Sequence, residues 1–164
     1  MEKQTQFHTI APVYDKGSRI LILGSFPSVK SREAAFFYGH PQNRLWRVLA
    51  AVLEEETPQT VEEKRSMLLR RGVALWDVIA SCEIAGSSDA SITNVVPNDL
   101  SRILTTAPVR RIFCNGGTAH RFYRRYDKAR FGPAQPLPST SPANARQSAD
   151  ELTGVWRAAL APWL

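Results

Sequence analysis

The sequence predicts an α/β fold, a three-layer α/β/α sandwich around a mainly parallel four-stranded sheet. Residues 19–24, 73–79 and 109–115 are short apolar runs with the length and composition of buried strands. Several stretches between and after them carry apolar residues at helical spacing. Alternation of such strands with helices is typical of a parallel sheet that helices cover on both faces.

The first strand, residues 19–24, ends at Gly24 and is followed by a long loop and a helix. The loop is dense in Gly, Pro, Ser, Asn and aromatic residues. From Asn43 onward, the segment NRLWRVLAAVL has one apolar face and is expected to pack on the sheet as a helix. That face consists of Leu45, Trp46, Leu49, Ala50 and Leu53.

The second helix occupies residues 58–71 and leads into the second strand. Thr57 followed by Pro58 has the form of an N-cap with proline at the first helical position, and Gly72 stands where a cap would end the helix. The strand carries Asp77, a charge at a position that should be buried. Such a carboxylate needs a structural or a functional explanation.

The third strand, residues 109–115, follows a long loop and a short helix. We interpret residues 80–97 as the loop, because they show little periodicity, and Asn98 as the cap of the short helix. After the strand, a helix near residues 118–129 would gather four basic side chains on one face. These are Arg121, Arg124, Arg125 and Lys128. A solvated surface and a contact with a polyanion explain this face equally well.

The last segments are a short extended piece, a turn-rich loop and a helix. The sequence PAQPLPSTSPANA after Gly132 supplies the extended piece and the loop. Ser148 can cap a final amphipathic helix. We find no internal repeat or linker, so residues 1–164 are expected to form one domain.

Composition limits the class of protein. With 164 residues, of which 43% are apolar, the chain can fill the core of one domain. A net charge of +6 and a pI near 9.7 favour a polyanionic partner. Because no stretch is apolar enough for a membrane span or a secretory signal, we expect a cytoplasmic protein with no membrane contact, and we assume a monomer.

The motifs of several enzyme classes are missing. Cys82 and Cys114 lie far apart, without CxxC spacing, so we expect two reduced, buried thiols, no metal and no cofactor. The chain also lacks the G-x-S-x-G, G-x-G-x-x-G and Walker motifs. A small-molecule α/β hydrolase or a nucleotide-binding enzyme is therefore disfavoured.

Two loops should form the functional site, because ligands of parallel sheets bind outside the carboxyl ends of the strands. They are residues 24–43 and 138–145. The composition of the first loop suits a shaped polar pocket with an aromatic wall better than a simple connection.

Three segments resemble the motifs of the uracil-DNA glycosylase superfamily. They are GSFPS at residues 24–28, YGHPQNRLW at residues 38–46 and LPSTSPAN at residues 137–144. The likeness is closest to the hypoxanthine-DNA (deoxyinosine) glycosylase branch and extends from about residue 19 to 156. It implies a monofunctional enzyme that flips a deaminated base out of DNA and hydrolyses its N-glycosidic bond with water.

The resemblance implies that Asn43 aligns the nucleophilic water. Other members of the superfamily often carry Asp or Asn in the first motif, where residues 25–28 of this chain read SFPS. The hypoxanthine branch places its catalytic asparagine at the position that matches Asn43. The alternative for Asn43 is a helix N-cap.

Further pocket residues come from the same segments. We expect Tyr38 to stack on the flipped base, with packing beside Phe36 and Phe37 as the alternative. His40 would donate a hydrogen bond to the leaving base or satisfy a loop carbonyl. Asp77 would recognise an N–H of the base, act as a general base, or be a buried acceptor for backbone amides. The predicted base pocket also contains Gly24, Ser25, Phe26, Pro27 and Gly39.

The third segment is expected to be a DNA-insertion loop. Its small hydroxyl side chains would bind phosphates, and residues 142–144 would fill the space of the everted base. The predicted DNA contacts are Ser28, Ser139, Thr140, Ser141, Pro142, Asn144 and Arg146. A generic Pro/Ser loop is the alternative.

Two other functions remain open. A glycosylase that removes uracil, particularly from mismatches, would use the same fold, although Leu137 stands where many uracil-removing relatives have histidine. A nucleic-acid-binding protein without catalytic activity would use the same basic surface.

Overall fold

The computed structural model describes residues 2–164 and confirms the α/β class. Four parallel strands form the central sheet in the order β3-β2-β6-β7. Their bounds are β2 Ile20–Gly24, β3 Val73–Asp77, β6 Arg111–Asn115 and β7 Gln135–Leu137. Strands β2 and β3 are buried along their whole length, which explains their continuous apolar sequences.

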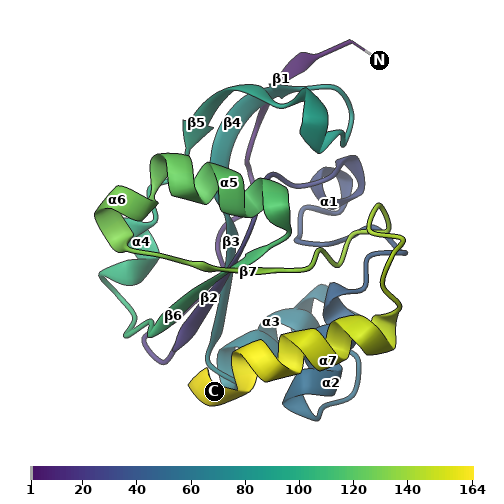
Figure 1. Cartoon of the computed structure of the whole chain (residues 1–164), viewed down its shortest axis with the longest axis vertical. Helices are drawn as coiled ribbons and strands as arrows, with labels where there is room; N and C mark the ends of the chain where they lie inside the picture. Colours follow the sequence, from purple (N-terminus) through teal and green to yellow (C-terminus); the bar gives the residue numbers. More distant parts are fainter. Residues whose placement is uncertain (1) are drawn as a thin grey trace.

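Helices cover both faces of this sheet (Figure 1). One layer contains α2 Leu45–Leu53, α3 Val61–Arg70 and α7 Ala149–Leu160, with α2 packed against α7. The other contains α4 Ser101–Leu104, α5 Gly117–Tyr126 and α6 Lys128–Phe131. A short helix, α1 Val29–Ala34, lies within the first predicted loop.

A second, antiparallel sheet corrects the interpretation of residues 80–97 as a loop. It has the order β1-β4-β5, formed by β1 Gln4–Phe7, β4 Ile79–Ile84 and β5 Thr93–Pro97. Strand β4 follows β3 after only Val78, and its Cys82 and Ile84 are buried. Its irregular register with β5 breaks the simple alternation that a sequence pattern detects.

Two predicted helix caps were misplaced. Helix α3 begins after Thr60, whose hydroxyl accepts the Glu63 N–H, and not at Pro58. Asn98 does not cap α4; its side chain donates to the carbonyls of Asp77 and Ile79. Asn98 therefore secures the end of β3, where the candidate site lies.

The cap of the final helix and the state of the two cysteines agree with the sequence analysis. Ser148 caps α7 as predicted, and together with Glu151 it forms a capping box. Cys82 and Cys114 are free and buried, and burial raises the pKa of the two thiols to about 11 and about 12. None of the helices in residues 2–164 has the length and apolarity needed to cross a membrane.

Candidate active site

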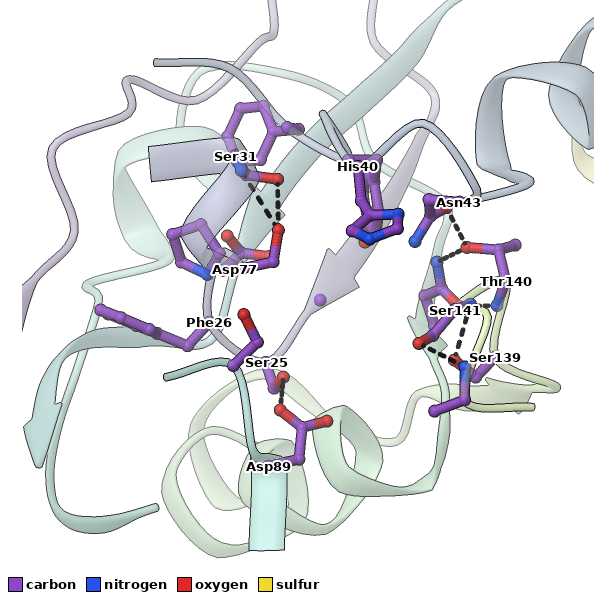
Figure 2. Close-up of a pocket in the computed structure, with 18 of the residues that line it drawn as sticks. Ser25, Phe26, Ser31, His40, Asn43, Asp77, Asp89, Ser139, Thr140 and Ser141 are labelled. Carbon is purple, nitrogen blue, oxygen red and sulfur yellow. Dashed lines mark hydrogen bonds between the residues drawn. The ribbon is translucent and has the colours of Figure 1, made fainter. Parts of the chain in front are cut away.

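A cavity of about 380 Å³ opens at the carboxyl edge of the parallel sheet, where both predicted loops meet. Its size lies within the range of ~300–1,000 Å³ that is usual for ligand sites. Figure 2 shows Asn43 and His40 on one side of it, Thr140 beside Asn43, and Ser25 with Asp89 on another side. The predicted residues that line it are Gly24, Ser25, Phe26, Pro27, Ser28, Tyr38, His40, Asn43, Asp77, Ser139, Thr140, Ser141 and Pro142.

Thr140 joins two asparagine side chains at this cavity. Asn115, at the end of β6, accepts the Thr140 N–H at 3.0 Å and donates through Nδ2 to Thr140 Oγ1 at 2.9 Å. The Thr140 hydroxyl in turn donates to Asn43 Oδ1 at 2.9 Å. Since Thr140 is completely buried, these hydrogen bonds are shielded from water.

This network determines how the Asn43 amide faces the cavity. Asn43 Oδ1 also accepts the Leu45 N–H at 3.0 Å, so the oxygen serves two donors. It thus performs the cap-like role that the sequence offered as an alternative, although helix α2 begins only at Leu45. The Asn43 Nδ2 remains as the group that can bind a ligand or a water in the cavity.

Arg44 holds the loop that follows β7. Its guanidinium donates to the carbonyls of Ser141 and Asn144, both at 2.8 Å, and to the carbonyls of Thr140 and Gln147. The Arg44 N–H donates to Thr140 O at 3.0 Å. One side chain therefore fixes the loop beside Asn43 through several backbone carbonyls.

Some predicted site residues lie outside the cavity lining or have other partners. The Gly39 N–H donates to Ser31 Oγ, and Asn144 Nδ2 donates to Ser139 O inside the loop. Arg146 is exposed and does not line the cavity. Ser28 lines it, but its hydroxyl caps α1 by accepting the Ser31 N–H.

Asp77, Gly24 and Tyr38 are in close contact at the cavity wall. Gly24 and Asp77 are register partners at the ends of β2 and β3. A Cβ on Gly24 would overlap Asp77 Oδ1 and lie 2.8 Å from the Tyr38 hydroxyl, so only glycine fits. Asp77 is 4% exposed.

The Tyr38 hydroxyl is buried and finds no hydrogen-bond partner among the described residues. Burial, and then the nearby Asp77 carboxylate, raise the pKa of Tyr38, so the hydroxyl stays protonated. None of the aromatic ring pairs found within residues 2–164 includes Tyr38. A protonated donor without an acceptor is available to a ligand in the cavity.

His40 makes a different loop contact from the one that the sequence predicted. Its Nδ1 accepts the Gln42 N–H at 3.1 Å, so the ring satisfies a loop amide and not a loop carbonyl. In the neutral tautomer that this contact requires, Nε2 carries the proton and can donate into the cavity.

A second carboxylate, Asp89, lines the cavity and accepts a hydrogen bond from Ser25 Oγ at 3.1 Å. Burial, and then the Asp77 carboxylate, raise the pKa of Asp89. Asp89 lies in the region interpreted as a loop, so sequence reasoning missed it. It also missed Asn115, whose only sequence signal is a polar residue that ends a buried strand before Gly116.

The basic face of α5 begins near the cavity. This helix follows Asn115, and its side chains Arg121, Arg124 and Arg125 are exposed. Lys128, also exposed, belongs to α6.

In the part of the chain that the structure describes, no three His, Cys, Asp or Glu side chains form a metal-binding group.

Known proteins resemble this chain over most of its length. The model of the uracil DNA glycosylase superfamily matches residues 11–160. A hypoxanthine DNA glycosylase of Methanosarcina acetivorans is 33% identical over 137 residues, which cover 83% of this chain and 87% of the relative. A hypoxanthine DNA glycosylase of Methanosarcina barkeri is 31% identical over 144 residues, covering 87% and 91%.

A solved structure agrees with these relatives. The solution NMR structure of a uracil DNA glycosylase candidate from Methanosarcina acetivorans superimposes with a TM-score of 0.77 at 32% identity. The match covers 96% of this chain and 98% of that one.

Proposed function

Because the chain belongs to the uracil DNA glycosylase superfamily, we propose that it is a monofunctional DNA repair glycosylase that removes hypoxanthine from deoxyinosine. The two Methanosarcina relatives carry the name hypoxanthine DNA glycosylase, which supports this substrate. The observation that carries the proposal is the hydrogen bond between Asn43 and Thr140, which unites the second and third motifs at one cavity.

The reaction needs a positioned water and a place for the leaving base. The C1′–N9 bond breaks, its electron pair stays on the purine, and the sugar gains oxocarbenium character. A water held by Asn43 Nδ2 then adds its oxygen to C1′, and the proton that it loses neutralises the departing hypoxanthine. The neutral amide orients the water without removing its proton, so departure of the base must precede most of the attack.

The cavity wall complements hypoxanthine. The base offers an N1–H donor beside the O6 acceptor. An Asp77 oxygen can accept from N1–H, while the Tyr38 hydroxyl or His40 Nε2 can donate to O6. Adenine offers an acceptor at N1 and a donor at C6. Its N1 would face the Asp77 carboxylate, which is also an acceptor, so adenine is disfavoured.

DNA would approach from the side of the loop that follows β7. Ser139 and Ser141 line the cavity mouth and can donate to phosphates, and Pro142 can occupy the space that the flipped base leaves. The exposed arginines of α5 supply sequence-independent attraction to the backbone.

Uracil is the second candidate base. It also presents an N–H beside a carbonyl oxygen, which Asp77 and Tyr38 would recognise in the same way. The structure from Methanosarcina acetivorans, which carries the name of a uracil DNA glycosylase, supports this alternative.

The test is base release from defined duplexes. The protein is incubated with duplexes that contain deoxyinosine, deoxyuridine, deoxyxanthosine or only normal bases, and abasic sites are cleaved with alkali. We expect strand breaks first and fastest with deoxyinosine. Faster cleavage of deoxyuridine would favour the second candidate, and tight binding of duplexes without any cleavage would show a silent nucleic-acid binder.

A further inference from the structure

His8 forms a buried pair with the cavity carboxylate. His8 Nε2 lies 2.7 Å from Asp77 Oδ2, and the two side chains are 1% and 5% exposed. Among residues 2–164, His8 is the only basic side chain within ion-pair distance of Asp77. His8 does not line the cavity, and its side-chain hydrogen bond to the cavity wall is the one with Asp77.

Aromatic rings surround the His8 imidazole. The imidazole lies 5.9 to 6.5 Å from the rings of Phe26, Phe37 and Trp76. The backbone N–H of His8 donates to Ala80 O at 2.7 Å, next to the residues that pair β1 with β4. The antiparallel sheet therefore delivers His8 to Asp77 independently of the three motif segments.

Because of this pair, the two oxygens of Asp77 have different surroundings. Oδ2 is occupied by His8, whereas Oδ1 lies against Gly24 and close to the Tyr38 hydroxyl at the cavity wall. A carboxylate rotates about its last bond when nothing holds it, and either oxygen could then turn away from a ligand. With Oδ2 held, the acceptor that faces the cavity has one orientation.

We propose that His8 is a positioning residue, which holds Asp77 so that Oδ1 accepts the N1–H of the flipped base. This inference rests on the proposed function, because it assumes a base in the cavity. The His8 side chain touches neither the base nor the sugar, and its contribution is to base discrimination.

The experiment compares two bases that differ in the N–H that Asp77 would read. Duplexes with uncleavable 2′-fluoro sugars carry either hypoxanthine or unsubstituted purine, which has neither N1–H nor O6, and their affinities are measured by fluorescence anisotropy. The variants are His8→Phe, which keeps a ring but loses the N–H, His8→Ala, and His8→Gln, which keeps an N–H near the position of Nε2. A ratio of two affinities in one preparation cancels any unfolded fraction.

We expect His8→Phe and His8→Ala to lower the preference for hypoxanthine ~10-fold, as for loss of a hydrogen bond to a charged group, and His8→Gln to restore most of it. Binding of the purine duplex should change less than ~2-fold, since its base lacks the group that Asp77 accepts. A wild-type ratio in His8→Phe, or an equal loss on both duplexes, would overturn the inference. Base release from deoxyinosine by the wild type tests the proposed function separately.

Discussion

Gly24 and Asp77 are so close across the β2–β3 pair that a methyl group on Gly24 would overlap Asp77 Oδ1. His8 holds Oδ2 of this carboxylate, and the Tyr38 hydroxyl lies 2.8 Å from the same Cβ position. The glycine of the first motif is thus required by packing at the cavity wall and not by its backbone conformation, since its φ is not positive.

Gly24→Ala should therefore damage the site more than the fold. We expect a loss of base release of at least ~10-fold, with a cost of ~1–3 kcal/mol in the free energy of unfolding from overpacking. Single-turnover cleavage and urea denaturation measure the two effects. Gly154→Ala is the matched control, since a Cβ there meets nothing within 4 Å. Wild-type activity in Gly24→Ala would show that Asp77 can move without consequence.

Removal of the Asn43 amide separates its two roles. Asn43→Ala loses the contact with the Leu45 N–H, worth ~1 kcal/mol as for a helix cap. It also loses the group proposed to hold the water, which should lower the cleavage rate ~100-fold or more. Rates are compared at a temperature where circular dichroism shows the variant folded. Lower stability with near-normal rates would reject the catalytic role.

Thr140 should matter because its hydroxyl connects the two asparagines. Thr140→Val keeps the shape but leaves Asn43 Oδ1 and Asn115 Nδ2 without a shared partner. We expect a ~10-fold slower reaction, as for one or two lost hydrogen bonds. Thr140→Ser retains the hydroxyl and should stay near the wild-type rate; equal losses in both variants would point to packing.

The sequence predicted the elements whose pattern is local. Strand β2 and helix α2 were evident because a buried strand is continuously apolar and a half-buried helix shows one apolar face. The antiparallel sheet was missed, since β5 is largely exposed and β4 pairs with it irregularly. The largely polar sequence of residues 80–97 resembles that of a loop. Its place in a sheet depends on β1, which lies more than 70 residues away in the chain and pairs with β4.

The site was predictable to the extent that its residues lie in motifs. Asn43 and Thr140 belong to recognisable segments, and the structure places both at the cavity. His8 belongs to no motif, and its importance depends on a contact with a residue 69 positions away. Asn115 and Asp89 likewise could be recognised as site residues only from the folded structure, which places both at the cavity. Neither residue type is unusual in its local sequence.

Arg44 should determine how rigid the loop after β7 is. Lysine has one nitrogen and cannot reach the carbonyls that the guanidinium binds, so Arg44→Lys should cost ~1–3 kcal/mol and weaken DNA binding. Hydrogen exchange over residues 139–147 and DNA affinity are the measurements. Arg47→Lys, at an exposed position in helix α2 three residues later, is the control. Unchanged exchange in Arg44→Lys would contradict the role.

The salt dependence of DNA binding can be assigned to α5. If Arg121, Arg124 and Arg125 each neutralise one phosphate, changing all three to Gln should reduce the slope of log affinity against log salt by ~3. Lys16→Gln is the control, because Lys16 is exposed and lies outside α5, before β2. An unchanged slope in the triple variant would show that α5 is a solvated surface.

The carboxyl group of Asp127 should make the free energy of unfolding depend on pH. It is 4% exposed, its Oδ2 has no hydrogen-bond partner among the described residues, and burial raises the pKa of its carboxyl to about 7. In the unfolded chain an aspartate has a pKa of ~3.9, so between pH ~4 and ~7 the folded protein binds more protons than the unfolded one. The free energy of unfolding must therefore fall as the pH rises through this window, and the loss is complete above it.

Asp127→Asn removes this titration while keeping the size of the side chain. We expect its melting temperature to exceed that of the wild type by more than ~4 °C at pH 8, because a pKa of about 7 against ~3.9 in the unfolded chain corresponds to ~4 kcal/mol and each kcal/mol shifts the melting temperature of a chain of this length by ~2–4 °C. The difference should shrink as the pH falls and vanish near pH 4, where the carboxyl is protonated in the folded wild type. Thermal unfolding at constant ionic strength from pH 4 to 8 measures it, with the exposed Asp15→Asn as control. A difference that does not change with pH would mean that Asp127 is already neutralised, or already charged, throughout the range.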